Sequence, residues 1–227
     1  PIRLPGTDGL IPPNRENAPA SSSAFHEAEW ELVRPLLIQA CGGTLADKVV
    51  VDAGCADGFF TLNLAREGAR VIALDIAVTM ILRTAAIAAL NGLHHRVVPR
   101  LGPTLELAAL LDRLAQSDPS LTPVDAICAL GLIYHFDHLV ENLEAMASLR
   151  VPMLLEFNAT PAAGEATFDP ARHRNPLPVS LPWLTGWLEA RGFEVIPEPA
   201  WPATVTALET RAIPLRQEML LALPVGR

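Results

Sequence analysis

The sequence predicts an α/β fold, in which helices cover both faces of a doubly wound, mostly parallel sheet that follows an N-terminal helical arm. Three observations favour this class. Apolar, β-branched runs of strand length alternate with longer segments of helical periodicity along most of the 227 residues. A turn that contains glycines follows the first of these runs. The second run ends in an acid about twenty residues after that turn.

The N-terminal part of the chain differs in composition from the rest. Residues 1–22 are rich in Pro, Gly, Asn and Ser, which is typical of an irregular arm. Ser23 then precedes acids and apolar residues at helical spacing, so we expect a helix that begins near Ser23 and ends at Gly42-Gly43. The length suits one domain, which we place at 23–227.

From residue 49 onward, the chain alternates between the two kinds of segment. We expect strands at 49–52, 70–74, 95–99, 124–130, 151–157 and 193–197, and helices at 58–67, 77–91, 104–116, 138–148 and 180–191. A last apolar run, Glu218 to Leu223, is expected to pair antiparallel with 193–197 at the sheet edge. The segment 159–180 is long for a connection, and such loops often close over a substrate.

The turn after the first strand reads Asp52-Ala53-Gly54-Cys55-Ala56-Asp57-Gly58. Its spacing differs from the G-x-G-x-x-G turn that binds a pyrophosphate, and its carboxylates would repel one. They suit a cationic nucleoside without phosphates, and Asp75 at the end of the next strand suits the ribose hydroxyls. S-adenosylmethionine fits this description. The alternative is an ordinary strand–turn–helix without a ligand.

Three motifs carry a resemblance to a known family. The turn resembles the Glu/Asp-x-Gly-x-Gly-x-Gly motif of class I S-adenosylmethionine-dependent methyltransferases, with Ala56 at the middle glycine. Two further segments resemble the branch with tRNA wobble-uridine (5-oxyacetate-pathway) enzymes and their small-molecule relatives. They are Leu130 to His135, and the pattern that runs from Arg172-His-Arg174-Asn to Trp-Leu-Glu-x-x-Gly-Phe. The resemblance covers about residues 49–197. It implies a seven-stranded Rossmann-like sheet, S-adenosylmethionine as donor and S-adenosylhomocysteine as co-product.

Candidate site residues follow from the ends of the expected strands and from this resemblance. His135 is the candidate catalytic base or orienting group, because a neutral imidazole is available near pH 7; the alternative is that it only packs at the strand end. The donor contacts are expected from Asp52, Gly54, Ala56, Gly58, Asp75, Ile76, Leu130 and Tyr134. The substrate contacts are expected from His26, Trp30, His138, Glu156, Asn158, Arg172 and Arg174.

Charge and spacing limit the partners. The net charge of −8 disfavours a nucleic acid, whose binding depends on Lys and Arg. Two arginines in 159–180 suit a carboxylate or phosphate on a small substrate, although a solvated charged loop is the alternative. His135-x-x-His138 with Glu156 has no specific metal spacing, so no metal is expected. No apolar run is long enough for a membrane span. Three cysteines without metal spacing favour reduced thiols in a cytoplasmic protein.

We therefore expect a methyltransferase that acts by SN2 displacement on an oxygen or nitrogen of a small molecule. The alternatives are a tRNA-modifying methyltransferase, a NAD-binding oxidoreductase and a non-enzymatic domain that only binds the donor. A continuous Lys/Arg surface beside the site would favour the tRNA enzyme, and nicotinamide binding would favour the oxidoreductase.

Overall fold

A computed structural model describes residues 2–3, 10–11, 21–159, 179–208 and 217–226 of the chain. Apolar runs of four to eight residues form the main sheet, because side chains on both of its faces are covered. Its strands are β3 (Val49–Ala53), β4 (Arg70–Asp75), β5 (Val97–Leu101), β6 (Ala126–Ala129), β7 (Met153–Asn158), β8 (Phe193–Pro197) and β9 (Gln217–Pro224).

The sheet has seven strands in the order β5-β4-β3-β6-β7-β9-β8. Strands β5, β4, β3, β6 and β7 are parallel, whereas β9 is antiparallel to both β7 and β8. The doubly wound, mostly parallel sheet is thus confirmed, as is the antiparallel pairing of the last apolar run with 193–197. The order reverses between β3 and β6, and in such sheets ligands bind beyond the carboxyl ends of the strands at this point.

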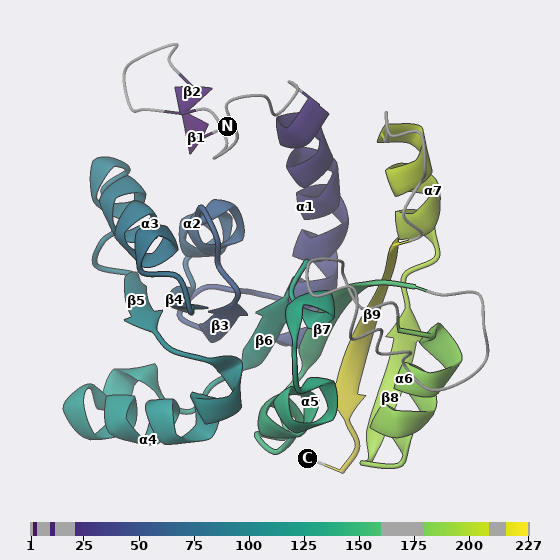
Figure 1. Ribbon diagram of the computed structural model, residues 1–227. Coiled ribbons are helices and arrows are strands. Elements are labelled where there is room, and N and C mark those ends of the chain that lie inside the picture. The colour runs from purple at the N-terminus through teal and green to yellow at the C-terminus, as the bar shows by residue number, and fades with distance from the viewer. Residues whose placement is uncertain (1, 4–9, 12–20, 160–178, 209–216, 227) are drawn as a thin grey trace.

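Helices form two layers around the sheet, as Figure 1 shows. One layer contains α1 (Ser21–Ala40), α2 (Phe59–Arg66), α3 (Val78–Leu90) and α7 (Ala200–Leu208), and the other contains α4 (Leu107–Ser117), α5 (Leu139–Ala147) and α6 (Leu181–Glu189). Because side chains alternate along a strand, β7 sends Leu155 and Phe157 toward the α4–α6 layer and Leu154 toward the other. Glu156 and Asn158 lie on the same face as Leu154, where an apolar residue is expected.

Some elements differ from the sequence-based expectations. The helix expected at 104–116 begins with a 3-10 turn, η1 (Thr104–Glu106), before α4. Helix α7 was not expected; its Pro202 stands in the first turn, where the missing N–H costs nothing. Two short antiparallel strands, β1 (Ile2–Arg3) and β2 (Leu10–Ile11), lie in the arm that was expected to be irregular.

Within the described residues, no helix has both the length and the apolar character that a membrane crossing requires.

Candidate active site

The glycine turn leaves β3 and enters α2 with three residues in the left-handed region. Gly54, Ala56 and Gly58 have φ values of 76°, 45° and 80°. A Cβ on Gly54 would lie 2.8 Å from Leu132 Cδ1, and one on Gly58 would lie 2.8 Å from Thr84 Oγ1. Glycine is therefore required at both positions by the backbone conformation and by the neighbouring side chains.

Two side chains hold the peptide groups on either side of Ala56 in place. The Ala56 N–H donates to Asp75 Oδ2 at 3.1 Å, and Thr84 Oγ1 donates to the Ala56 carbonyl at 3.1 Å. Asp75 Oδ1 also accepts from the Ala77 N–H at 2.8 Å. A carboxylate accepts about four hydrogen bonds, so Asp75 keeps room for two more, beside the turn.

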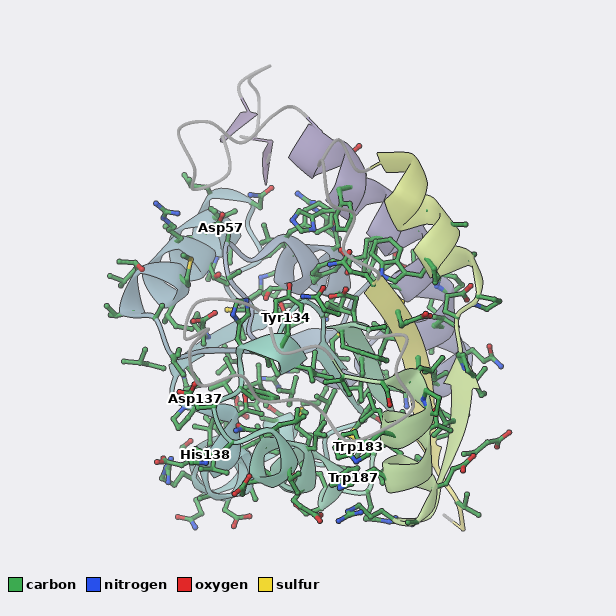
Figure 2. All side chains as sticks on the ribbon, turned by 45° about the vertical axis from the view of Figure 1, so that its right-hand side comes forward. Asp57, Tyr134, Asp137, His138, Trp183 and Trp187 are labelled. Carbon is green, nitrogen blue, oxygen red and sulfur yellow. The ribbon has the colours of Figure 1, made fainter. Side chains whose placement is uncertain are left out.

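The two acids of the turn itself, Asp52 and Asp57, have surroundings that the sequence argument did not include. Asp52 is buried beneath the turn, where it accepts a hydrogen bond from Thr61, and burial raises its pKa to about 6. Asp57 forms an ion pair with Arg83 at 3.1 Å (labelled in Figure 2). Arg83 on α3 therefore offsets part of the negative charge that the sequence argument assigned to Asp57. Asp52 is thus buried and Asp57 is paired, whereas Asp75 keeps acceptor capacity beside the turn.

A loop after β6 covers the turn from the other side. Leu132 packs against Gly54, and Tyr134 and His135 follow in a 3-10 turn, η3 (Ile133–His135). The rings of Tyr134 and His135 have centroids 4.6 Å apart. Partial desolvation lowers the pKa of His135 below its usual value while the Asp75 charge acts in the opposite sense, although the side chain keeps access to solvent. The imidazole is therefore neutral at pH 7.

Helix α1 lies over the start of α2. The His26 ring has its centroid 5.4 Å from that of Phe59 and 5.9 Å from that of Phe60, the two residues that directly follow the turn. Trp30, one turn further along α1, is partly buried against the core of the same layer. This places both expected substrate residues of α1 on the side of the sheet where the turn lies.

A buried polar cluster occupies the carboxyl end of β7. Glu156 is 2% exposed; its Oε2 accepts from the Gly131 N–H at 2.7 Å, and its Oε1 has no hydrogen bond of standard geometry among the described residues. The buried Trp201 indole N–H, which is likewise unpaired by this criterion, lies beside the carboxyl group and lowers its pKa. Asn158 is 4% exposed and neither atom of its amide is paired within the same set. Gln217, opposite Asn158 on β9, has a buried Oε1 that is likewise unpaired there.

Glu29 of α1 completes this cluster and was not expected from the sequence. It is buried, lies 3.3 Å from His26 Nδ1, and its charge raises the pKa of Glu156. A sequence signal existed, because Glu29, Val33 and Leu37 follow one another at four-residue spacing and so share the apolar face of α1.

The remaining expected residues are placed as follows. Ile76 is 76% exposed directly after Asp75, and Leu130 is buried at the end of β6. The His138 side chain is 70% exposed and lies 4.0 Å from Glu141, well away from Tyr134 in Figure 2. No group of three or more His, Cys, Asp or Glu within the described ranges could hold a metal. Arg172, Arg174 and most of the expected lid 159–180 lie outside the described residues.

Replacing Gly58 with alanine tests the packing of the turn. We expect a loss of about 2–4 kcal/mol in the free energy of unfolding, from left-handed strain and from displacement of Thr84. Gly92→Ala is the matched control, because Gly92 has a φ of 70° and nothing lies within 4 Å of its Cβ position. We expect about 1–2 kcal/mol for this control in chemical denaturation. Equal losses in the two variants would contradict the role of the Thr84 contact.

Two raised carboxyl pKa values predict how stability depends on pH. Burial raises the pKa of Glu156 to about 8 and that of Asp52 to about 6. The folded protein thus holds these protons more tightly than the unfolded chain, so the contribution of these two groups to the free energy of unfolding should fall as pH rises from about 4.5 to about 8. Glu156→Gln should reduce this fall, because the amide cannot titrate. Denaturant titrations that show stability rising across this window would contradict the assignment.

Comparisons with known proteins bear on this site. The profile of the family described as "Methyltransferase domain" matches residues 25–198. Among solved structures, magnesium protoporphyrin IX methyltransferase from Synechocystis PCC 6803 with bound SAM is 16% identical, with a TM-score of 0.64, and the match covers 96% of this chain and 86% of that one. The SAH-bound N-terminal domain of EvdMO1 is 16% identical, with a TM-score of 0.57 and coverages of 92% and 82%. The YcgJ protein from Bacillus subtilis is 15% identical, with a TM-score of 0.58 and coverages of 85% and 98%. No curated protein sequence gives a significant match.

Proposed function

The chain belongs to the methyltransferase-domain family, and from this premise we propose that it transfers the methyl group of S-adenosylmethionine to an oxygen or nitrogen of a small molecule. The observation that carries the proposal is the turn held at Ala56 by Asp75 and Thr84, with two acceptor positions of Asp75 left open. Two neighbouring hydroxyls of a ribose match two such positions on one carboxylate.

Each side of the turn has a role in donor binding under this proposal. The backbone of Gly54, Ala56 and Gly58 approaches the donor, and Asp75 binds the ribose. The exposed Ile76 side chain offers an apolar surface next to Asp75 for a purine ring. Leu130 and Tyr134 lie on the opposite loop, toward the methionine part. Asp52 acts from beneath, where its bond to Thr61 connects β3 to α2.

The residues of the site need to supply alignment and, for a hydroxyl or an ammonium acceptor, removal of a proton. The sulfonium donor brings an already activated methyl group. His135 is neutral at pH 7 and keeps access to solvent, so it is able to take a proton from the acceptor or to orient it. Helix α1 and the loop after β6 flank the turn, and they limit the space in which the acceptor approaches the methyl group.

A small acceptor is favoured over a nucleic acid by the charge of the chain. The net charge of the chain is −8, and the buried polar cluster at the carboxyl end of β7 contains the acids Glu29 and Glu156. Phosphate-rich partners are bound mainly through Lys and Arg. Three solved structures of similar fold are named above. Their low identity makes them evidence for the fold, and the acceptor is argued from this chain alone.

Calorimetric titration of the protein with S-adenosylmethionine, S-adenosylhomocysteine and NAD tests the proposal. We expect the first two to bind with one site per chain and NAD not to bind at the same concentrations. Binding of NAD without binding of either sulfur nucleoside would overturn the proposal in favour of an oxidoreductase.

A further inference from the structure

The polar cluster at the end of β7 has more hydrogen-bonding capacity than its neighbours satisfy. It consists of Glu29, Glu156, Asn158 and Gln217, contributed by α1, β7 and β9. Three of its oxygens, Glu156 Oε1, Asn158 Oδ1 and Gln217 Oε1, are buried without a hydrogen bond of standard geometry among the described residues, and so are two donors, Asn158 Nδ2 and the Trp201 Nε1 beside Glu156. An unpaired buried polar group costs about 1–3 kcal/mol, so such groups call for a specific partner.

Within the described part of the chain, no positive charge balances the two acids of this polar cluster, so burial raises the pKa of both Glu29 and Glu156 and favours their protonated forms. Two acids, Glu29 and Glu156, influence each other electrostatically, and among the described residues neither forms an ion pair with a lysine or arginine. His26 on α1 is the titratable group that contacts Glu29. From the other elements, Glu156 accepts from the Gly131 N–H of the loop, the Trp201 indole N–H of α7 lowers its pKa by hydrogen bonding, and Met219 is its register partner on β9; the Tyr134 hydroxyl lies near Gly131. None of these supplies a positive charge to Glu156.

One chemical group matches the three oxygens and would let a buried acid ionise. A primary ammonium has three N–H donors and one positive charge, and it has no acceptor that the oxygens would repel. A hydroxyl or a carboxylate meets these oxygens less well, because the first has one donor and no charge and the second is negative. A buried charge is tolerated where it is paired and hydrogen-bonded, which an ammonium would achieve for Glu156.

The polar cluster also lies close to the proposed donor site. Glu156 Oε2 is hydrogen-bonded to Gly131, the residue that follows Leu130 and precedes Leu132 on the loop against the turn. Val179 donates from its backbone N–H to the Asn158 carbonyl at 2.9 Å, so Val179 lies beside the end of β7. A group bound at the polar cluster is therefore near the proposed donor site.

We propose that the cluster of Glu29, Glu156, Asn158 and Gln217 is an acceptor-recognition site that binds the protonated amine of a small-molecule methyl acceptor. This inference rests on the proposed methyltransferase function, because it assigns the polar cluster to the acceptor. It differs from the anionic acceptor that Arg172 and Arg174 suggested in the sequence. Those two residues lie outside the described structure. The inference concerns binding, and the methylated atom can be the amine or another atom of the same molecule.

Benzylamine and benzyl alcohol are the probes that test the charge requirement. The two molecules have similar shapes, and only benzylamine is a cation near neutral pH. Ligand-observed NMR titrations of the protein saturated with S-adenosylhomocysteine should show benzylamine binding about tenfold or more tightly than benzyl alcohol. Equal affinities, or no binding of benzylamine, would overturn the inference.

Two variants test whether benzylamine binds at the polar cluster. Glu156→Gln should weaken benzylamine binding by about tenfold or more and leave its S-adenosylhomocysteine affinity unchanged. Glu218→Gln is the matched control, because Glu218 is a buried acid on β9 whose neighbours Gln217 and Met219 lie on the face of the polar cluster, so it points to the other face. We expect this control to bind benzylamine like the wild type. An unchanged affinity in Glu156→Gln would overturn the inference.

The pH dependence gives a readout that a purely structural role would not change. Since Glu156 must be ionised to hold a cation, and burial raises its pKa to about 8, benzylamine affinity should rise about tenfold between pH 6 and pH 7. A flat profile contradicts the inference. Titration of S-adenosylhomocysteine into the same wild-type samples tests the proposed function separately: donor binding without amine binding refutes only the acceptor site, and the reverse result refutes only the donor site.

Discussion

Replacing Asp75 with alanine is expected to weaken S-adenosylmethionine and S-adenosylhomocysteine binding by about tenfold to about a hundredfold. Hydrogen bonds to a charged group contribute about 1.5–3 kcal/mol, and the substitution removes those to the ribose. It also removes the carboxylate that accepts from the Ala56 and Ala77 N–H groups, which hold the turn in position. Calorimetry on the variant and the wild type gives the ratio of the dissociation constants.

The neighbouring acid of the turn provides a matched control. Asp57 is paired with Arg83, so Asp57→Ala should change donor affinity by no more than about threefold. If Asp57→Ala lost as much affinity as Asp75→Ala, general negative charge would explain donor binding and the specific role of Asp75 would be refuted.

Replacing His135 with alanine should slow methyl transfer by about a hundredfold or more and leave donor affinity unchanged. The reason is that His135 is neutral and solvent-accessible beside the turn, where it is able to accept a proton from the attacking group. The measurement is a single-turnover assay with labelled S-adenosylmethionine and an acceptor that the wild type methylates. In the wild type the rate should rise with pH through the pKa of His135, below the usual histidine value, and then level off.

His138→Ala is the control for this prediction. Its side chain is 70% exposed and lies near Glu141, so we expect its removal to leave the transfer rate within about twofold of the wild type. A His135→Ala enzyme that transfers methyl groups at the wild-type rate and keeps the same pH profile would exclude His135 as the base.

Local patterns in the sequence predicted most of the fold. Strands β3 and β4 are β-branched runs, and the glycines between them have positive φ, so the turn and Asp75 were placed correctly by spacing alone. The insertion of β9 between β7 and β8 was not predictable in this way. It depends on which strand edges remain open after the rest of the sheet has formed, and the local sequence of 217–224 does not encode that choice.

The site was predicted less completely, because its chemistry depends on long-range contacts. The pairing of Asp57 with Arg83 joins the turn to α3, and it offsets part of the charge that Asp57 suggested in isolation. Glu29 and Glu156 meet across α1 and β7, which are far apart in the sequence. Periodicity places Glu29 on the apolar face of its helix, yet it does not identify the second acid that faces it there.

A crystal structure of the protein grown with S-adenosylhomocysteine is the most direct test of the account. We expect the nucleoside against the backbone of Gly54 to Gly58, with both ribose hydroxyls within hydrogen-bond distance of the Asp75 carboxylate and the purine beside Ile76. Crystals in which this position stays empty at saturating ligand, or in which it binds a diphosphate instead, would contradict the central claim that the turn and Asp75 hold a nucleoside without phosphates.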